Sequence, residues 1–220
     1  MTILTMRIGC LHTANSNIPV FDAALASLAC ADVRLSHQVR PDLLAAAVAA
    51  GGLNDEIVLQ TSEALAALCA VNEVVLLTCS TLGPVVSAFV SSTPVLRVDE
   101  ALARQAVTMS TSVVALCAVE TTLAPTRALF EQRARETGAT VDVRLVDDAW
   151  GYFMAGEMAR YDLTMAQAAD SAYAEGAGVV AFAQASMAGA AAYVRHNRSA
   201  LTSPISGLQA AIAACRNQSD

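Results

Sequence analysis

One cysteine, Cys79, has the sequence surroundings of a reactive thiol. It follows the apolar run 74–77 and precedes Ser80 and Thr81, residue types that often begin helices. At a helix N-terminus, unpaired N–H groups and the helix dipole stabilise a thiolate. The position suits a thiol that acts as a base or a nucleophile, and a buried structural thiol is the equal alternative.

The other five cysteines lie in apolar surroundings, where cysteine is usually a small buried side chain. Cys30, Cys69 and Cys215 fall in helical Ala/Leu-rich segments, and Cys10 and Cys117 fall in apolar strand-like runs. The sequence has no Cys-x-x-Cys pair and no cysteine–histidine spacing typical of metal ligands, so it predicts no metal site. Free thiols and an N-terminus without signal-peptide features predict a cytoplasmic location.

Polar residues follow several other apolar runs, at points where the first N–H groups of a helix are unpaired. Any one of these residues is better explained as an ordinary helix cap, but several of them after consecutive strands favour a site that binds a carboxylate. The residues that we expect to bind substrate are Asn15, Ser80, Thr81, Thr121, Thr122, Gln184 and Ser186.

His12 is a second candidate catalytic residue, because an unperturbed imidazole suits proton transfer at neutral pH. That role requires the loop after the first strand to curl over the site. The alternative is a histidine at the surface or one that caps a loop. Glu120, Asp147 and Asp148 are the acids near strand ends, and their simpler interpretation is charge at helix N-termini.

The elements that must position these residues form an alternating pattern of short β-branched runs and Ala/Leu-rich segments, which predicts βαβ units and a mainly parallel sheet. We expect strands at 6–12, 32–38, 73–79, 94–98, 112–118, 139–146 and 177–183. We expect helices at 17–29, 41–50, 54–71, 83–91, 99–109, 121–137, 148–158, 164–175, 187–200 and 204–215. In open parallel sheets ligands bind beyond the carboxyl ends of the strands, where the candidate residues lie.

An internal repeat relates the two halves of the chain. The segment 74–83 is similar to the segment 179–188, at an offset of 105 residues, and a weaker similarity relates the runs that end at Cys10 and Cys117. We therefore predict an α/β fold of two pseudo-symmetric lobes, each a mainly parallel sheet flanked by helices, with the active-site cleft between them. The first lobe is expected at residues 1–99 plus 201–220, and the second at 100–200.

Two motifs carry a family resemblance. The stretch Thr-Cys-Ser-Thr-Leu-Gly-Pro at 78–84 resembles the first cysteine motif of the aspartate/glutamate/hydantoin racemase superfamily, and Gln-Ala-Ser-Met-Ala at 184–188 resembles the second. That superfamily includes arylmalonate decarboxylase and maleate isomerase, and the similarity covers the whole chain. It implies a racemase or isomerase with no cofactor, which acts through Cys79 at the carbon next to a carboxylate or carbonyl of a small acid.

The sequence departs from the superfamily pattern at one position, because Gln184 stands where the second cysteine is expected. An amide side chain has no titratable proton, so it cannot act as the second acid or base of a two-cysteine racemase. The resemblance then implies, as alternatives, a single-cysteine enzyme of the decarboxylase type or a catalytically inactive homologue that binds carboxylates. Gln184 would donate hydrogen bonds to a substrate carboxylate or oxyanion.

Composition excludes several other classes of function. The 220 residues are 55% hydrophobic and 15% charged, which predicts a folded protein. A net charge of −7 without a Lys/Arg cluster argues against nucleic acid and anionic membranes as partners. The uncharged segments 74–96 and 176–194 contain too many Gly, Pro, Ser or Gln residues for membrane spans. The high apolar content favours a homo-oligomer, a dimer or higher.

Overall fold

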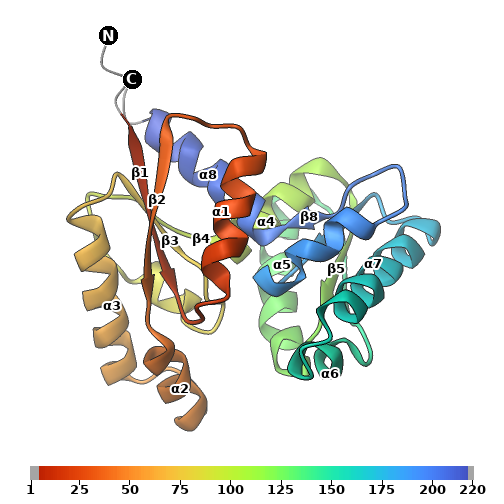
Figure 1. Cartoon of the computed structure of the whole chain (residues 1–220), viewed down its shortest axis with the longest axis horizontal. Coiled ribbons are helices and arrows are strands. Elements are labelled where there is room, and N and C mark those ends of the chain that lie inside the picture. Colours follow the sequence, from red (N-terminus) through yellow and green to blue (C-terminus); the bar gives the residue numbers. More distant parts are fainter. Residues whose placement is uncertain (1–4, 218–220) are drawn as a thin grey trace. The chain divides into compact units, whose positions relative to one another are not determined.

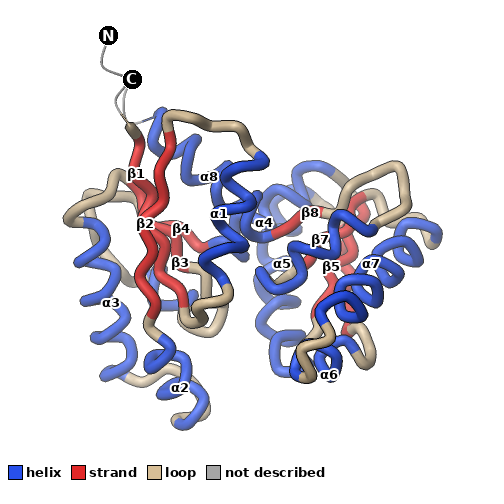
Figure 2. Tube along the Cα trace, in the orientation of Figure 1, coloured by secondary structure: helices blue, strands red, loops and turns tan. Residues whose placement is uncertain are grey.

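The computed structural model describes residues 5–217 (Figures 1 and 2). Packing divides the chain into two compact units: unit 1 is Met1–Val98 with Gly207–Asp220, and unit 2 is Asp99–Ser206. Each unit has one four-stranded sheet in which every strand pair is parallel. The predicted α/β class, with two parallel sheets flanked by helices, is confirmed.

The sheet of unit 1 has the strand order β2-β1-β3-β4. Its central strand β3 reads Val-Val-Leu-Leu and is buried at every residue, as expected for a parallel strand that is covered on both faces. The elements of this unit are β1 (Met6–His12), α1 (Asn17–Ser27), β2 (Val33–Val39), α2 (Pro41–Ala49), α3 (Asp55–Cys69), β3 (Val74–Leu77), the 3₁₀ helix η1 (Gly83–Ser87), β4 (Val95–Arg97) and most of α8 (Ser203–Asn217).

The sheet of unit 2 has the strand order β6-β5-β7-β8. Its elements are α4 (Val98–Met109), β5 (Ser112–Cys117), the 3₁₀ helix η2 (Glu120–Thr122), α5 (Leu123–Thr137), β6 (Thr140–Leu145), α6 (Ala149–Met154), α7 (Met158–Ala174), β7 (Val179–Phe182), the 3₁₀ helix η3 (Ala185–Tyr193) and β8 (Leu201–Thr202).

Equivalent hydrogen bonds show that the two units repeat one another. The Thr78 N–H donates to the Leu11 carbonyl at 3.1 Å, and the Ala183 N–H donates to the Leu116 carbonyl at 3.0 Å. Both members of the second pair lie 105 residues after those of the first, which is the offset of the sequence repeat. The residue after Thr78 is Cys79 and the residue after Ala183 is Gln184, so these two occupy equivalent positions.

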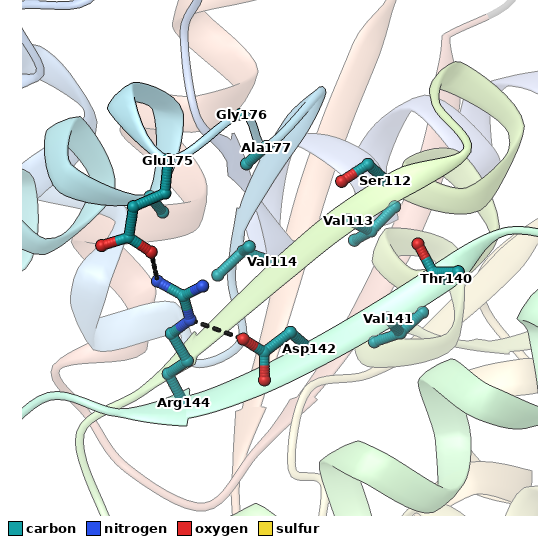
Figure 3. Close-up of a pocket in the computed structure, with 11 residues that line it drawn as sticks. Ser112, Val113, Val114, Thr140, Val141, Asp142, Arg144, Glu175, Gly176 and Ala177 are labelled. Carbon is teal, nitrogen blue, oxygen red and sulfur yellow. Dashed lines mark hydrogen bonds and ion pairs between the residues drawn. The ribbon is translucent and has the colours of Figure 1, made fainter.

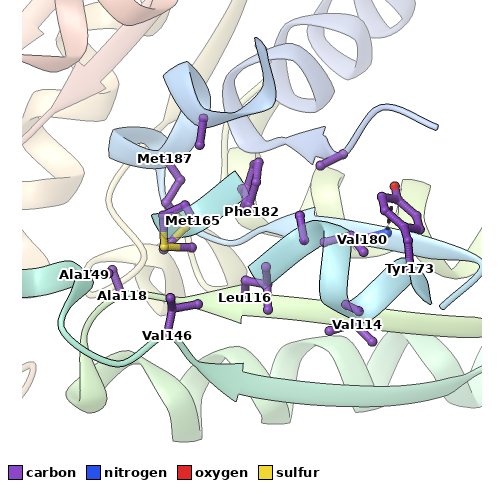
Figure 4. Close-up of a cluster of buried hydrophobic side chains, with 14 of the residues drawn as sticks. Val114, Leu116, Ala118, Val146, Ala149, Met165, Tyr173, Val180, Phe182 and Met187 are labelled. Carbon is purple, nitrogen blue, oxygen red and sulfur yellow. Dashed lines mark hydrogen bonds between the residues drawn. The ribbon is translucent and has the colours of Figure 1, made fainter. Parts of the chain in front are cut away.

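Alternate residues of β5 supply two different apolar layers in unit 2, because successive side chains of a strand leave opposite faces. Val114 and Leu116 pack with Met165 of α7 and with Met187 of η3 (Figure 4). Ala115 and its neighbours on the other face pack against buried residues of α4 and α5. The strand is therefore held from both sides, which fixes the position of the loop that follows it.

The sheet of unit 1 is covered in the same manner. Leu11 and Leu77 pack in a cluster with buried residues of α2 and α3. On the opposite face the rings of His12 and Phe21 lie 5.2 Å apart, which places α1 against the end of β1. Figure 1 shows α3 on one side of this sheet and α1 and α8 on the other.

Local chemistry sets several helix ends. Helix α3 begins after Asn54, whose side-chain oxygen accepts from the Ile57 N–H at 2.9 Å. Acidic residues follow in its first turn, where they complement the helix dipole. Helix α5 ends at Gly138, which has a φ of 76° and so adopts the left-handed conformation that terminates helices at glycine.

The predicted helices after β3 and β7 were wrong in type and length. The segment expected as a helix at 83–91 is a 3₁₀ helix at Gly83–Ser87, and the one expected at 187–200 is a 3₁₀ helix at Ala185–Tyr193. The helix expected at 121–137 consists of η2 followed by α5, and the two-residue strand β8 was not predicted. All seven expected strands are present, with ends within three residues of those predicted.

No helix among residues 5–217 is long and apolar enough to cross a membrane. The two uncharged segments consist instead of a buried strand, a loop and a 3₁₀ helix in each case.

Candidate functional site

The carboxyl ends of β1 and β3 lie at the same edge of the unit 1 sheet. Leu11 pairs with Leu77 in parallel register, so the loop that begins at Thr13 and the loop that begins at Thr78 both leave this edge. Cys79 lies in the second loop, between the end of β3 and the start of η1. The structure thus places Cys79 at the edge where parallel sheets bind ligands.

Cys79 and its neighbours differ in exposure. The Cys79 thiol and Ser80 are half-buried, and Thr81 is exposed. Side chains of the cluster between the sheet and α3 pack against Cys79. The helix that follows has only five residues and begins at Gly83, four positions beyond the thiol. A stabilising helix dipole, which the sequence predicted at this position, is therefore not supplied by η1.

Arg97 brings a positive charge to the Cys79 loop. It is the last residue of β4, and a Cβ atom placed on Gly83 would lie 2.5 Å from the Cζ and Nε atoms of its guanidinium. The guanidinium therefore lies directly against the backbone at Gly83, and a Cβ atom at this position would require the Arg97 side chain to move. A guanidinium is the side chain best suited to pair with a carboxylate through two hydrogen bonds.

His12 is the last residue of β1 and is completely buried, so it does not lie in the loop that the sequence analysis considered. Its Nδ1 contacts the Thr78 hydroxyl at 2.8 Å, and its Nε2 contacts Nδ1 of His37 at 2.9 Å. His37 in turn contacts the Asp22 carboxylate through Nε2 at 3.1 Å. Both ring nitrogens of His12 are therefore engaged by protein groups.

Burial determines the charge of His12. Burial, together with the smaller effect of the neighbouring His37, lowers the pKa of His12 to about 4, while the charge of Asp22 acts in the opposite direction. The imidazole of His12 is accordingly neutral at neutral pH. Asn15, the other candidate from this segment, is exposed in the loop between β1 and α1.

Gln184 joins two strand-end loops of unit 2. Its Oε1 accepts from the Ala118 N–H at 3.0 Å, and its Nε2 donates to the Thr122 hydroxyl at 2.5 Å. The Thr122 hydroxyl donates in turn to the Val119 carbonyl at 2.6 Å. A backbone N–H can only donate, so the orientation of the amide is fixed and one N–H of the Gln184 amide is left for another acceptor.

The remaining candidates of unit 2 have different surroundings. Ser186, in η3, shares a 2.9 Å hydrogen bond with the hydroxyl of Tyr161 from α7. Burial raises the pKa of Tyr161 to about 12, so its hydroxyl keeps its proton. Thr121 is exposed in η2. In this unit the structure brings Gln184 and Thr122 together through a hydrogen bond and pairs Ser186 with a tyrosine.

Three residues near these loops were not identified from the sequence. Arg97 ends an expected strand, so its place at the carboxyl edge was available from the strand pattern. His37 lies beside His12 only because of the register between β1 and β2, which the sequence does not show. Tyr161 lies in the middle of α7, where no signal distinguishes it from an ordinary core tyrosine.

A pocket in unit 2 lies at the opposite edge of the sheet (Figure 3). It is lined by the first residues of β5 and β6 and by the segment after α7. Arg144 crosses it, with Nε 2.7 Å from Asp142 and Nη1 2.6 Å from Glu175. Two carboxylates already compensate this guanidinium, so the pocket has no free positive charge for an acidic substrate.

Comparison with solved structures identifies the fold. Aspartate racemase from Picrophilus torridus matches with a TM-score of 0.71 at 13% identity, over 96% of this chain and 94% of that one. Allantoin racemase from Klebsiella pneumoniae matches with a TM-score of 0.70 at 16% identity, over 97% and 89%. An aspartate racemase homologue from Pyrococcus horikoshii matches with a TM-score of 0.67 at 14% identity, over 96% and 100%.

These similarities confirm the racemase-type fold that the two motifs predicted, since they extend over nearly the whole length of each chain. No protein-family model matches the sequence, and a search of curated proteins gave no match.

Proposed function

We propose that the protein is a cofactor-independent enzyme of the racemase or isomerase type that acts at the carbon next to a carboxylate or carbonyl of a small acid. Cys79 is the proposed acid/base residue. The observation that carries the proposal is a half-buried thiol in the loop after β3, at the carboxyl edge of a parallel sheet in a racemase-type fold.

In the proposed reaction the Cys79 thiolate removes the proton from the α-carbon, and the electron pair of the broken C–H bond moves into the carboxylate to give an enediolate. Proton return to the carbon reforms the acid. The charge of the enediolate must be stabilised by hydrogen-bond donors, which is the largest contribution in reactions of this kind. The proposed donors are Asn15, Ser80, Thr81, Thr121, Gln184 and Ser186. The Thr122 hydroxyl already donates to the Val119 carbonyl, so its proposed part in substrate binding is to orient the Gln184 amide.

Gln184 has a limited part in this proposal. Its carbonyl oxygen and one N–H are used by Ala118 and Thr122, so it offers a substrate one hydrogen bond and no proton. His12 has both ring nitrogens engaged, which leaves the acid/base step to Cys79 alone. A single proton carrier suits stereospecific protonation after loss of CO₂ better than racemisation, so a decarboxylase-like reaction is the main alternative within the proposal.

Solvent exchange tests the proposal directly. The protein is incubated in D₂O with aspartate, allantoin and a substituted malonate, and deuterium at the α-carbon is followed by NMR. Aspartate and allantoin are chosen from the named activities of the similar structures, and they offer a carbon next to a carboxylate and next to a ring carbonyl respectively. We expect incorporation with at least one compound, and a loss of about 100-fold or more in Cys79→Ser, as for removal of a general acid/base.

Cys69→Ser is the matched control, because Cys69 is another half-buried thiol of unit 1 but lies in α3. It should exchange at the wild-type rate. Exchange that persists in Cys79→Ser would show that Cys79 is not the proton carrier.

A carboxylate-binding protein without catalysis is the second candidate, and the internal hydrogen bonds of Gln184 favour it. They show an amide that braces two loops where the two-cysteine enzymes require a proton carrier. Calorimetric binding of the same acids with no deuterium exchange would support this function and contradict catalysis.

Two further properties belong to the proposal. No disulfide joins the cysteines among residues 5–217, which suits a reducing compartment such as the cytoplasm. Large apolar side chains such as Val90, 94% exposed, suit a homo-oligomer, which light scattering would detect and a monomeric mass would exclude.

A further inference from the structure

Three potential metal ligands converge on one face of the unit 1 sheet. Cys10 and His12 are two residues apart on β1, so their side chains leave the same face, and Cys10 pairs with His37 of β2 in parallel register. The ligand atoms of Cys10, His12 and His37 all lie within 4.8 Å of one another. Cys10 and His12 are completely buried, and the His37 side chain is 14% exposed.

Hydrogen bonds fix the tautomer of His12. The Thr78 hydroxyl donates its hydrogen to the Leu11 carbonyl at 3.0 Å, so it can only accept from His12 Nδ1 at 2.8 Å. The hydrogen of His12 is therefore on Nδ1. The lone pair of Nε2 points toward His37, whose Nδ1 lies 2.9 Å away.

His37 is oriented by a carboxylate in the same manner. A carboxylate accepts hydrogen bonds, so the contact of 3.1 Å between Asp22 and His37 Nε2 places a hydrogen on Nε2. The Nδ1 lone pair of a neutral His37 then faces the Nε2 lone pair of His12. Two lone pairs at 2.9 Å repel one another unless a proton or a cation lies between them.

We propose that Cys10 Sγ, His12 Nε2 and His37 Nδ1 bind one zinc ion, with Asp22 and Thr78 as the outer groups that orient the two imidazoles. Thiolate and imidazole together select borderline-soft ions such as Zn²⁺. Histidine ligands of zinc typically donate their second N–H to a carboxylate or another oxygen, as both histidines do here. This site is separate from the proposed Cys79 chemistry and does not depend on it.

The distances require small adjustments only. Zinc–nitrogen bonds of about 2.05 Å at a tetrahedral angle place two nitrogens about 3.3 Å apart, so the 2.9 Å contact widens by about 0.4 Å. The thiol moves by no more than about 1.2 Å to reach its distance of about 3.6 Å from each nitrogen. Side-chain rotation supplies movements of this size without displacement of β1 or β2.

Charge balance suits the buried position. When zinc binds, the Cys10 S–H bond breaks, its proton passes to the solvent and a zinc–sulfur bond forms. The two positive charges of zinc are then matched by the Cys10 thiolate and the Asp22 carboxylate, so the burial of an uncompensated charge is avoided. A zinc ion can reach the three ligands from the side of His37 and Asp22, because the Asp22 side chain is 58% exposed.

Cobalt(II) is the spectroscopic probe for the test. Protein stripped of metal with a chelator is titrated with Co²⁺, and a thiolate-to-cobalt charge-transfer band in the near ultraviolet is expected to saturate at one equivalent, then to disappear on addition of Zn²⁺. If the wild-type protein develops no such band, the proposal is overturned and the two histidines share only a proton.

Variants identify the ligands. Cys10→Ser should abolish the band, whereas Cys117→Ser, which removes a buried thiol from β5, should keep it. Asp22→Asn should weaken Co²⁺ affinity about 10-fold or more, as for loss of an outer hydrogen bond. Glu63→Gln, an exposed acid on α3, is its control and should leave the affinity unchanged. A band that survives Cys10→Ser would also overturn the assignment, and circular dichroism establishes that each variant is folded.

Discussion

Replacement of Gln184 by leucine should destabilise unit 2. Leucine keeps most of the side-chain volume but removes the acceptor of the Ala118 N–H and the donor to the Thr122 hydroxyl. Ala118 is only 3% exposed, so water does not readily replace the lost acceptor. The Thr122 hydroxyl keeps its hydrogen bond to the Val119 carbonyl, so the loss of the Gln184 donor costs less at Thr122 than the loss of the acceptor costs at Ala118.

The expected cost follows from these contacts. A buried backbone N–H left without a partner costs about 1–3 kcal/mol, and an ordinary hydrogen bond contributes about 1 kcal/mol. Gln184 itself is half-buried, and leucine recovers some apolar contact, so we expect the free energy of unfolding to fall by about 1–2 kcal/mol. For urea denaturation this lowers the midpoint by about 0.5–1 M.

Trp150 makes the measurement specific to unit 2. It is the only tryptophan of the chain, lies in α6 and stacks on Phe153 at 5.1 Å between ring centroids, so its fluorescence reports the unfolding of that unit. Gln132→Leu, an exposed position on α5, is the matched control and should leave the midpoint where it is in the wild type. If Gln184→Leu behaves like that control, the amide does not brace the two loops.

Two further predictions concern a glycine and a tyrosine. Gly83→Ala places a Cβ atom 2.5 Å from the Arg97 guanidinium. Because the guanidinium is the end of a flexible side chain and can rotate away, the free energy of unfolding should fall by only about 1 kcal/mol in thermal or urea denaturation. Gly151→Ala in α6 meets no atom within 4 Å and should be neutral or slightly stabilising, and equal effects of the two substitutions would contradict the Arg97 contact. Burial raises the pKa of Tyr161 to about 12 from an ordinary value of 10, so its contribution is complete below about pH 10 and is lost as the pH rises toward 12, about 3 kcal/mol in all. Urea midpoints at pH 9 and pH 11 should show about half of that loss in the wild type and a smaller one in Tyr161→Phe.

The strands and the repeat could be predicted because their signal is local. Strands β3 and β7 are continuous apolar runs that are buried at every residue, and the similarity around them gave the correct offset of 105 residues. That offset predicts that Cys79 and Gln184 lie at equivalent strand ends, as they do in the structure. The role of Cys79 remains a prediction, since its chemistry depends on a substrate.

Tertiary packing accounts for what the sequence did not show. The Ala-rich segment that forms η3 has a high propensity for α-helix, yet it is a 3₁₀ helix. It packs closely on α7: a Cβ atom at Gly189 would lie 2.9 Å from the Asp162 carboxylate. The cluster of Cys10, His12 and His37 depends on the register between two strands that lie more than twenty residues apart in the chain. Spacing along the sequence gave no sign of it.

The discontinuity of unit 1 has a consequence for synthesis on the ribosome. Helix α8 follows β8 in the chain, but from Gly207 on it belongs to unit 1, where Leu208 and Ala211 are completely buried. The strands of unit 1 are therefore synthesised first, but the unit is completed last. All of unit 2 must be synthesised before α8 emerges from the exit tunnel. During that interval apolar surface of the nascent unit 1 is open to chaperones, and a ribosome that stalls before Gly207 leaves a chain that cannot complete its first-made unit.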